Sequence, residues 1–375
     1  MRIVRLANFV TPRSGGLRTA LRELGAGYAA AGHEPVLVIP GPHAADEATP
    51  QGRVVTLPGP LVPGVGGYRV LVDRARLART LAALRPDRLE VSDRSTLRWT
   101  GDWARRAGVP SMMVSHESLA GLLRAVPGGA LAADRLNARS AAAYDRIVCT
   151  TAWAAAEFAR VGAPVTRAPL GVDLAFFRPG RHDPALRDRL AGPHEVLVVH
   201  CGRLSTEKRV DRSVRAVAAA RRAGLRATLV VAGDGPLRER LTVQAARDAV
   251  PVRWLGHVAG RDRLAALLAT ADVVLAPGPV ETFGLAALEA LASGTPVVVS
   301  GQSALPEVVG AAGAVVPGDD AAVWGAALAE VADRPVADRR AAARARAERF
   351  GWPAAVAAFL AAHRAGVSEG DRVPQ

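Results

Sequence analysis

Short apolar runs alternate along this chain with longer segments in which apolar residues recur every three or four positions. The short runs predict buried strands and the longer segments predict amphipathic helices. In the first half we expect strands at residues 3–9, 35–39, 54–57, 111–114 and 146–150, and helices at residues 17–31 and 68–84. Because strands and helices alternate, the sheet should be parallel and covered by helices.

The second half repeats this alternation. We expect strands at residues 195–200, 227–232, 252–255, 273–276 and 296–299, and helices at residues 211–223, 237–248, 264–269, 285–292 and 320–331. A stretch rich in Pro and Gly, residues 169–180, separates the halves, so we predict two doubly wound α/β domains, residues 1–174 and 175–351. Ligands of such sheets bind beyond the carboxyl ends of the strands, which places the expected site in a cleft between two facing domains.

Composition narrows the class of protein. The 375 residues exceed the roughly 250 to 300 at which one core usually splits into two. Half of the residues are hydrophobic and 22% are charged, which excludes a disordered chain. No apolar run approaches the roughly 18 residues of a membrane span, and Met1 leads directly into a strand without a signal peptide. We therefore expect a cytoplasmic protein. Cys149 and Cys201 fit no metal-binding spacing and are expected to be reduced core thiols.

The net charge of +13 comes from 48 cationic residues of which 47 are Arg, a bias that a GC-rich genome explains most simply and that an anionic partner would also explain. A basic surface attracts anionic lipid, nucleic acid or a phosphorylated substrate. Nucleic acid is disfavoured, because aromatic residues make up only 4% of the chain and no known nucleic-acid-binding module is present. Lys208 is the one Lys among 48 cationic residues, which suggests that a compact ammonium group is needed there.

The pair Glu281 and Glu289 is the first candidate for chemistry. Glu281 follows an expected strand in a loop, and Glu289 lies in a helix that we expect to begin near Phe283. The carboxylates are thus one or two helical turns apart and could bind sugar hydroxyls, while the first-turn amides, exposed at Gly284, could bind phosphate. A helix cap and a surface residue would explain the pair as well. A glycosidase pair is disfavoured, because one loop and its own helix cannot flank a bond from two sides.

A second candidate is the loop at residues 202–209, which follows another expected strand. Arg203 and Lys208 lie in it and could neutralise a diphosphate, with Thr206 as the expected N-cap of the next helix. Gly233, after the neighbouring strand, and Gly15 and Gly16, after the first strand, are either turn residues or points of close approach to a phosphate. His116 follows a further strand at a carboxyl end, where it is either structural or catalytic.

These motifs together resemble the retaining glycosyltransferases of family four. The matching segments are residues 14–16, 116, 169–173, 202–208, 233–236, 255–258 and 281–289, in the family's order and spacing. The resemblance covers nearly the whole chain and implies the GT-B fold, in which two Rossmann-like domains face each other across a cleft. It also implies that residues 352–375 form a helix that returns to the first domain and a tail. One departure is the stretch 277–279, where the family commonly has Ser after the first Pro.

The resemblance also implies roles for the candidate residues. Arg203 and Lys208 would bind the donor diphosphate, and Glu289 would bind the ribose. Glu281 and the backbone of Phe283, Gly284 and Leu285 would bind the transferred sugar and the adjacent phosphate, and His116 would contact that sugar. The other expected donor contacts are Gly15, Gly16, Gly202, Gly233 and Val258. The family usually needs no metal, and the leaving phosphate takes the acceptor's proton.

We therefore predict a retaining glycosyltransferase that uses a nucleoside-diphosphate sugar. We favour GDP-mannose over a UDP-sugar. The acceptor is either a lipid-linked glycoside, such as a phosphatidylinositol mannoside, or a soluble metabolite, and a nucleotide-sugar epimerase is a further alternative. A lipid acceptor would suit docking of the first domain on the inner face of the plasma membrane, because residues 61–68 form an apolar loop beside a basic helix. The cations of that segment are Arg69, Arg74, Arg76 and Arg79.

Overall fold

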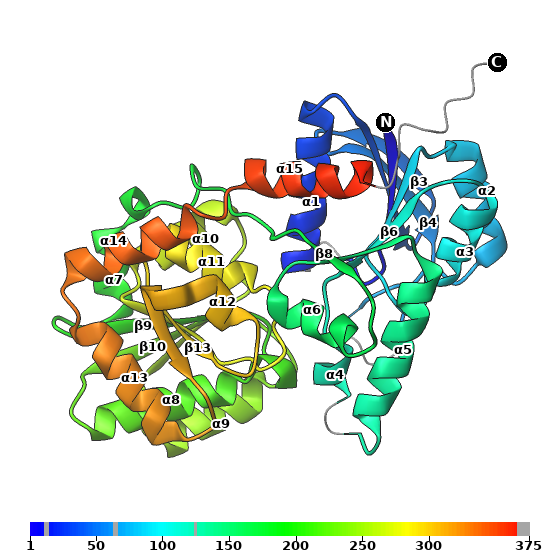
Figure 1. Cartoon of the computed structure of the whole chain (residues 1–375). Helices are drawn as coiled ribbons and strands as arrows, with labels where there is room; N and C mark the ends of the chain where they lie inside the picture. Colours follow the sequence, from blue (N-terminus) through cyan, green and yellow to red (C-terminus); the bar gives the residue numbers. More distant parts are fainter. Residues whose placement is uncertain (11–14, 63–66, 124–125, 366–375) are drawn as a thin grey trace. The chain divides into compact units, whose positions relative to one another are not determined.

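The computed structural model describes residues 1–10, 15–62, 67–123 and 126–365. The chain forms two compact units, which Figure 1 shows in the colours of the sequence. The first comprises Met1–Gly171 and the chain from Trp352 onward, and the second comprises Val172–Gly351. The chain thus passes into the second unit after Gly171. The sequence predicts this break slightly later, after Leu174.

The first unit is built on one sheet. Its described strands have the order β3-β4-β2-β1-β5-β6-β7-β8, and all neighbouring pairs are parallel except β3 with β4. The strands are β1 Arg2–Leu6, β2 Glu34–Gly41, β3 Ala45–Thr49, β4 Gly52–Pro58, β5 Arg88–Val91, β6 Ser111–Ser115, β7 Arg146–Cys149 and β8 Val165–Arg167. The helices are α1 Gly16–Ala30, α2 Arg74–Leu84, α3 Trp99–Arg106, α4 Leu119–Leu122, α5 Gly129–Ala143, α6 Ala152–Ala159 and α15 Trp352–Arg364.

The second unit contains a parallel sheet of order β11-β10-β9-β12-β13-β14. Its strands are β9 Val196–Cys201, β10 Ala227–Ala232, β11 Val252–Gly256, β12 Val273–Ala276, β13 Val297–Ser300 and β14 Gly313–Val316. The α-helices are α7 Pro184–Leu190, α8 Val210–Arg222, α9 Arg238–Arg247, α10 Arg261–Thr270, α11 Leu285–Ala292, α12 Leu305–Val309, α13 Ala321–Asp333 and α14 Val336–Ala347. Three short 3₁₀ turns, η1 Pro179–Arg181, η2 Thr206–Lys208 and η3 Gly310–Ala312, complete it. The predicted fold of two doubly wound α/β domains is confirmed.

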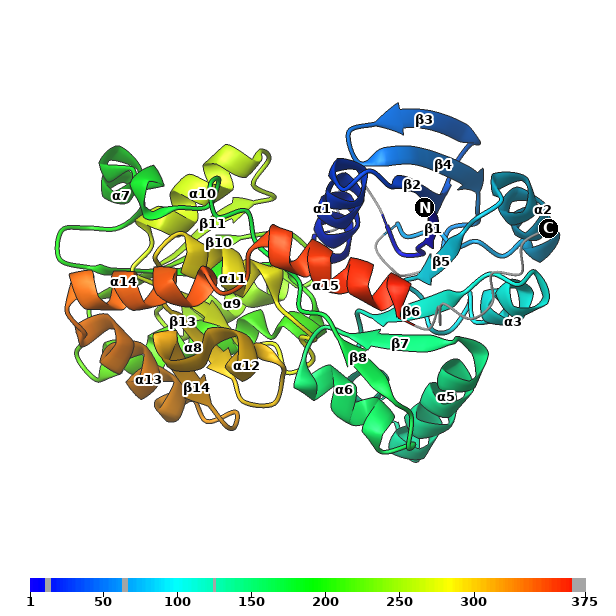
Figure 2. The ribbon, with the colours of Figure 1, turned by 45° about the horizontal axis from the view of Figure 1, so that its top comes forward.

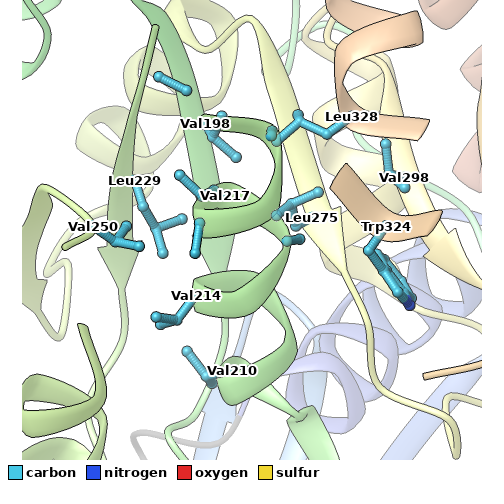
Figure 3. Close-up of a cluster of buried hydrophobic side chains, with 14 of the residues drawn as sticks. Val198, Val210, Val214, Val217, Leu229, Val250, Leu275, Val298, Trp324 and Leu328 are labelled. Carbon is cyan, nitrogen blue, oxygen red and sulfur yellow. The ribbon is translucent and has the colours of Figure 1, made fainter. Parts of the chain in front are cut away.

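The core of the second unit shows why these segments become helices and strands. Val214 and Val217 are three residues apart on α8, so they share one face of the helix, and that face lies on the sheet (Figure 3). Trp324 of α13 is 1% exposed and packs into the same cluster. The strands contribute Val198, Leu229, Leu275 and Val298. Apolar residues at helical and strand spacing thus meet in one buried layer.

Two expectations about local structure are wrong. The helix expected at residues 68–84 begins only at Arg74, because the side chain of Asp73 accepts a hydrogen bond from the Arg76 amide, at 2.9 Å, and caps the helix there. The first strand ends at Leu6 and not at Phe9, whose backbone has a φ of 60°. Strands β3, β5 and β14 were not predicted; in β5, Arg88 and Glu90 give the segment the composition of a surface stretch.

Helix α15 belongs to the first unit. It lies beside α1 (Figure 2), where Gly27 leaves room for Val356: a Cβ at position 27 would come within 2.2 Å of the Val356 side chain. Its far end is fixed to the sheet, since Arg88 Nε donates to the His363 carbonyl at 2.9 Å. Helix α15 therefore packs on the first unit, whereas the residues before Trp352 belong to the second unit.

Candidate active site

The loops after β9 and β12 meet, because the two strands are neighbours in the sheet and their carboxyl ends lie at one edge. Lys208 follows β9 and Glu281 follows β12. The Lys208 ammonium donates a hydrogen bond to Glu281 Oε1, and the two side chains are 34% and 22% exposed. Burial lowers the pKa of Lys208, but the adjacent Glu281 carboxylate outweighs burial and raises it overall. The structure therefore pairs Lys208 with Glu281, although the sequence suggested that Lys208 binds a diphosphate and Glu281 binds a sugar.

Buried Arg212, on α8, fixes the loop that carries Glu281. Arg212 is 3% exposed and donates to the Pro277 carbonyl at 3.0 Å, and it also pairs with Asp319. In the same loop, a Cβ at Gly278 would lie 3.0 Å from the Glu207 carbonyl. The two loops thus pack closely together. Sequence reasoning missed Arg212, because a position two residues after Val210 faces away from it on a helix and one Arg among many does not indicate burial.

Glu289 lies on α11 near the end of β9. Burial raises the pKa of its carboxyl group to about 7, although Arg261 acts in the opposite direction. Burial, and then the Glu289 charge, raise the pKa of the Cys201 thiol to about 12, while Lys208 acts against them. The electrostatic coupling places Glu289, Cys201 and Lys208 in one neighbourhood. Both cysteines are free thiols, but Cys201 is only half-buried, so the expectation of two core thiols is wrong for it.

Gly284 directs the start of α11. The helix begins at Leu285, as the apolar periodicity predicts, and Gly284 precedes it with a φ of 83°. A Cβ there would lie 2.1 Å from Leu305 Cδ2, so both conformation and space require Gly. Among the described residues no side chain caps α11, and the Ala287 amide donates to the Gly284 carbonyl at 3.0 Å, so the amides of the first two helix residues are the ones suited to bind an anion. The Phe283 ring is buried against Phe350, at 6.1 Å between centroids, so only its backbone is suited to contact a ligand.

The glycines after β9 and β10 also have a structural role in the packing of their loops. The Gly202 amide donates to the Ala232 carbonyl at 3.0 Å, and a Cβ at Gly233 would lie 1.8 Å from the Gly202 carbonyl. Gly233 is therefore required for packing of the two loops. Thr206 does not cap α8 as expected: it starts η2, and Arg209 precedes α8 with a φ of 51°. Arg203, beside Gly202, and Val258, in the loop after β11, are both half-buried.

In the first unit, His116 follows β6 in a loop that Arg94 supports. Arg94 donates to the Ser115 hydroxyl and to the Glu117 carbonyl, on either side of His116. It is itself 2% exposed and pairs with Glu157 at 3.2 Å. Burial lowers the pKa of His116 to about 4; Glu90 acts against this, and the charges of Arg5 and Arg94 add to it. The imidazole is thus neutral at pH 7. Sequence reasoning did not find Arg94 or Glu157.

A second buried network lies close to His116. Glu90, on β5, is 1% exposed and accepts hydrogen bonds from Arg5 Nε at 2.8 Å and from the Tyr28 hydroxyl at 2.9 Å. His363 of α15 lies 3.1 Å from the same carboxylate. Burial raises the pKa of Glu90, but the Arg5 charge and His363 lower it by more, so the group stays ionised. This network joins α15 to β1.

Gly15 and Gly16 begin α1 at the carboxyl edge of the first sheet, and both are exposed. Among the described residues no atom lies within 4 Å of a Cβ built at Gly15. Packing against the described residues of the unit therefore does not explain Gly15, whereas close approach of a ligand would. Ser14, which the sequence motif includes, lies outside the described residues.

Metal-binding clusters and membrane-spanning helices are both absent from the described part of the chain. No three His, Cys, Asp or Glu side chains in it are grouped so that they could hold a metal ion. None of its helices is both long and apolar enough to cross a membrane.

Comparison with known proteins places the chain in a family. A model of the group 1 glycosyl transferases matches residues 195–334, and a model of the glycosyl transferase 4-like domain matches residues 15–171. A GDP-mannose-dependent alpha-(1-6)-phosphatidylinositol dimannoside mannosyltransferase from Mycobacterium tuberculosis strain H37Ra is 49% identical over 366 residues, which cover 96% of this chain and 95% of the relative. The chain belongs to the group 1, or family four, glycosyltransferases.

Solved structures agree on the fold of this glycosyltransferase. A sucrose-phosphate synthase from Thermosynechococcus elongatus superposes with a TM-score of 0.75 at 21% identity, covering 97% of this chain and 98% of that one. Anabaena HepE, in complex with UDP and glucose, gives a TM-score of 0.76 at 19% identity, covering 97% and 99%. The resemblance noted in the sequence is thus confirmed, and the glycosyltransferase has the GT-B fold.

Proposed function

We propose that this glycosyltransferase moves a mannosyl group from GDP-mannose to a hydroxyl of a phosphatidylinositol mannoside. The observation that carries the proposal is the 49% identity with the mycobacterial mannosyltransferase over nearly the full length of both chains. Such similarity to a transferase disfavours an epimerase, and the name of the relative favours a lipid-linked acceptor over a soluble one.

The proposed roles of the residues follow the family motif. Arg203 and Lys208 bind the diphosphate, and Glu289 binds the ribose. Glu281 and the backbone of residues 283–285 bind mannose and the adjacent phosphate. Gly202, Gly233 and Val258 complete the donor contacts on the second unit, and Gly15, Gly16 and His116 contribute from the first. The Lys208–Glu281 pair supports this division, because it holds a cation beside the group that is to bind the sugar.

We propose a mechanism with retention and without a metal. The bond between the anomeric carbon and the diphosphate breaks, the acceptor oxygen bonds to the same face of the sugar, and a diphosphate oxygen takes the acceptor's proton. The negative charge that develops on the diphosphate is stabilised by Arg203, Lys208 and the first-turn amides of α11. The neutral imidazole of His116 can donate one hydrogen bond and accept another at the sugar.

One experiment tests this function. The purified protein is incubated, with EDTA present, with GDP-mannose or a UDP-sugar and either a phosphatidylinositol mannoside or a soluble inositol phosphate. We expect mass spectrometry to detect one added hexose only with GDP-mannose and the lipid, and proton NMR to show the α-anomer. Transfer from the UDP-sugar or to the soluble acceptor alone would replace the proposed substrates. A requirement for added magnesium or manganese would contradict the metal-free mechanism.

A cytoplasmic location at the inner face of the plasma membrane is part of the proposal. The cations Arg74, Arg76 and Arg79 of α2 are exposed, and so is Val72, at 57%. Arg69 contributes less than expected, because it donates to the Gly59 carbonyl at 2.6 Å. Of the apolar loop, residues 63–66 lie outside the described residues. Exposed Arg beside exposed apolar side chains is the arrangement that an anionic bilayer attracts.

A further inference from the structure

A groove of about 400 Å³ runs along α1 in the first unit, between this helix and strands β2 and β4. Figure 2 shows β3 and β4 at this end of the sheet, next to α1. The groove lies within one unit and contains none of the candidate site residues named above. Its volume is in the range of pockets that hold small organic ligands, roughly 300 to 1,000 Å³.

The floor of this groove is apolar. Leu37 and Ile39 of β2 and Val54 of β4 line it, together with Leu21 of α1. These side chains belong to a small apolar cluster that is separate from the main core of the unit. The separation follows from the pleat, since Val36 and Val38 of the same strand point to the opposite face and into the main core. An apolar floor that borders open space is suited to an apolar ligand.

One side of the groove carries charge. Arg18 and Arg22 are four residues apart on α1, so they lie on the same side of the helix, and both line the groove. Arg22 is exposed. Glu23 also lines the groove, so the three side chains together carry one net positive charge. The groove therefore offers a guanidinium pair beside an apolar floor.

The groove extends along α1. Arg18 and Ala26, which both line the groove, are eight residues apart on α1, a distance of about 12 Å along the helix axis. At the Ala26 end of the groove, α1 comes close to the turn that joins β3 and β4: a Cβ at Gly25 would lie 2.5 Å from the Gln51 carbonyl. Pro50 and Gln51 of this turn line the groove at that end. A groove of this length along one helix can hold a linear chain.

We propose that the groove binds one acyl chain of the lipid acceptor, with the lipid phosphate at Arg18 and Arg22. The inference rests on the proposed lipid acceptor and adds how the protein holds it. Arg18 lies less than one turn from Gly15 and Gly16, at the carboxyl edge of the sheet. A phosphate at Arg18 therefore leaves the inositol and its sugars at that edge, where the residues with proposed catalytic roles begin. The chain extends away from it along α1.

Direct binding tests the groove without any transfer reaction. Alkyl phosphates of increasing chain length, up to dodecyl phosphate and below their micelle concentrations, are titrated into the full-length protein by calorimetry, with inorganic phosphate as reference. We expect the affinity to rise about fourfold for each added methylene until the groove is full. An affinity that does not depend on chain length would overturn the proposal.

Variants locate the binding. Ala26→Leu fills the groove and should weaken dodecyl phosphate at least tenfold, whereas Ala30→Leu, an exposed position on the same helix, should not change it. Arg22→Gln should weaken dodecyl phosphate but not dodecyl maltoside, which has the chain without the phosphate. Because Arg22 is a surface residue, this comparison remains valid if Ala26→Leu disturbs the fold. Equal binding of dodecyl phosphate to the wild type, Ala26→Leu and Arg22→Gln excludes the groove.

The outcome is separable from that of the proposed function. If the protein binds dodecyl phosphate through the groove but transfers no mannose to the phosphatidylinositol mannoside, the binding groove is confirmed and the assigned acceptor is wrong. If transfer occurs but the groove variants bind dodecyl phosphate and transfer mannose like the wild type, the proposed function is confirmed and the acyl-chain site is wrong. The affinity for GDP should be the same in all these variants and serves as the test of an intact donor site.

Discussion

Glu289, in the proposed donor site, changes its ionisation near neutral pH, because burial raises the pKa of its carboxyl group to about 7. Ribose hydroxyls donate hydrogen bonds, so they bind the ionised carboxylate better than the protonated acid. The ionised fraction grows about tenfold between pH 6 and pH 8. We therefore expect calorimetry to show GDP binding about tenfold tighter at pH 8 than at pH 6.

The matched variant is Glu289→Gln, which keeps the size of the side chain and removes its titration. GDP changes its own ionisation in this range, and that contribution is common to both proteins. The difference between their pH profiles therefore reports on Glu289 alone. Parallel profiles in the two proteins would show that Glu289 does not contact the ribose.

The pair of Lys208 and Glu281 allows a second prediction, because the two residues have different proposed ligands but bind each other. Lys208→Ala removes a charge-assisted contact to the diphosphate and should weaken GDP at least tenfold, a loss of about 1.4 kcal/mol or more. Glu281→Gln removes the competing carboxylate, so GDP should bind as tightly as before or more tightly. Transfer of mannose should nevertheless fall, since Glu281 is to bind the sugar.

Calorimetry with GDP and a mannosyl-transfer assay on the same preparations check this prediction. The two readouts should separate in Glu281→Gln and fall together in Lys208→Ala. A Glu281→Gln variant that loses as much GDP affinity as Lys208→Ala would contradict the division of roles.

At the scale of single elements, the start of α11 depends on Gly284. Gly284→Ala places a side chain at a φ of 83° and 2.1 Å from Leu305 Cδ2. Left-handed backbone at a non-Gly residue costs of the order of 1 to 3 kcal/mol, and the clash adds to that cost. We expect a lower melting temperature of the second unit and weaker GDP binding, because the first-turn amides move. Scanning calorimetry with and without GDP measures both effects.

Gly318→Ala is the control for this variant. Gly318 also lies in the second unit, but its backbone is not left-handed, and among the described residues no atom lies within 4 Å of a Cβ built there. We expect this change to leave the melting temperature within about 1 °C of the wild type and GDP binding unchanged. Similar losses in the two variants would mean that the start of α11 has no special role.

How far the sequence could predict these elements depended on the chemistry of each segment. Strands β10 and β12 and helix α11 have the boundaries that apolar periodicity indicates. Strand β5 was missed because its two charged residues are satisfied by distant partners, Glu90 by Arg5 and His363. These partners are 85 and 273 residues away along the chain, and no local pattern reports a pairing of that kind.

The candidate site shows the same limit. The residues at the carboxyl ends of strands could be named from the sequence, since strand order and loop position place them at one edge. The contact of Lys208 with Glu281 could not, because it joins positions 73 residues apart. Arg94 and Arg212 were missed for a related reason. Each acts by holding a loop through buried hydrogen bonds, and a lone Arg in a sequence with many does not indicate burial.

At the scale of the whole molecule, each unit has its own sheet and its own buried core. The chain enters the second unit after Gly171 and returns to the first at Trp352. The return is fixed by specific bonds, from His363 to Glu90 and from Arg88 to the His363 carbonyl. Truncation before Trp352 would therefore leave the ionised, buried Glu90 without one of its partners, in the unit that also carries His116.

The net charge of +13 leads to the last prediction, which concerns membrane docking. Each exposed Arg near an anionic surface contributes about 1 kcal/mol at most, so Arg74, Arg76 and Arg79 together supply enough attraction to be measured at low salt. The full-length protein should co-sediment with phosphatidylglycerol vesicles at low salt and less so at physiological salt, because salt screens the attraction. Replacing the three Arg by Gln should abolish most of the sedimentation. Replacing Arg222, Arg226 and Arg240, which are exposed on the second unit, lowers the net charge equally and should change it little. If both triple variants lose sedimentation to the same extent, the attraction is a property of the total charge and α2 is not a docking element.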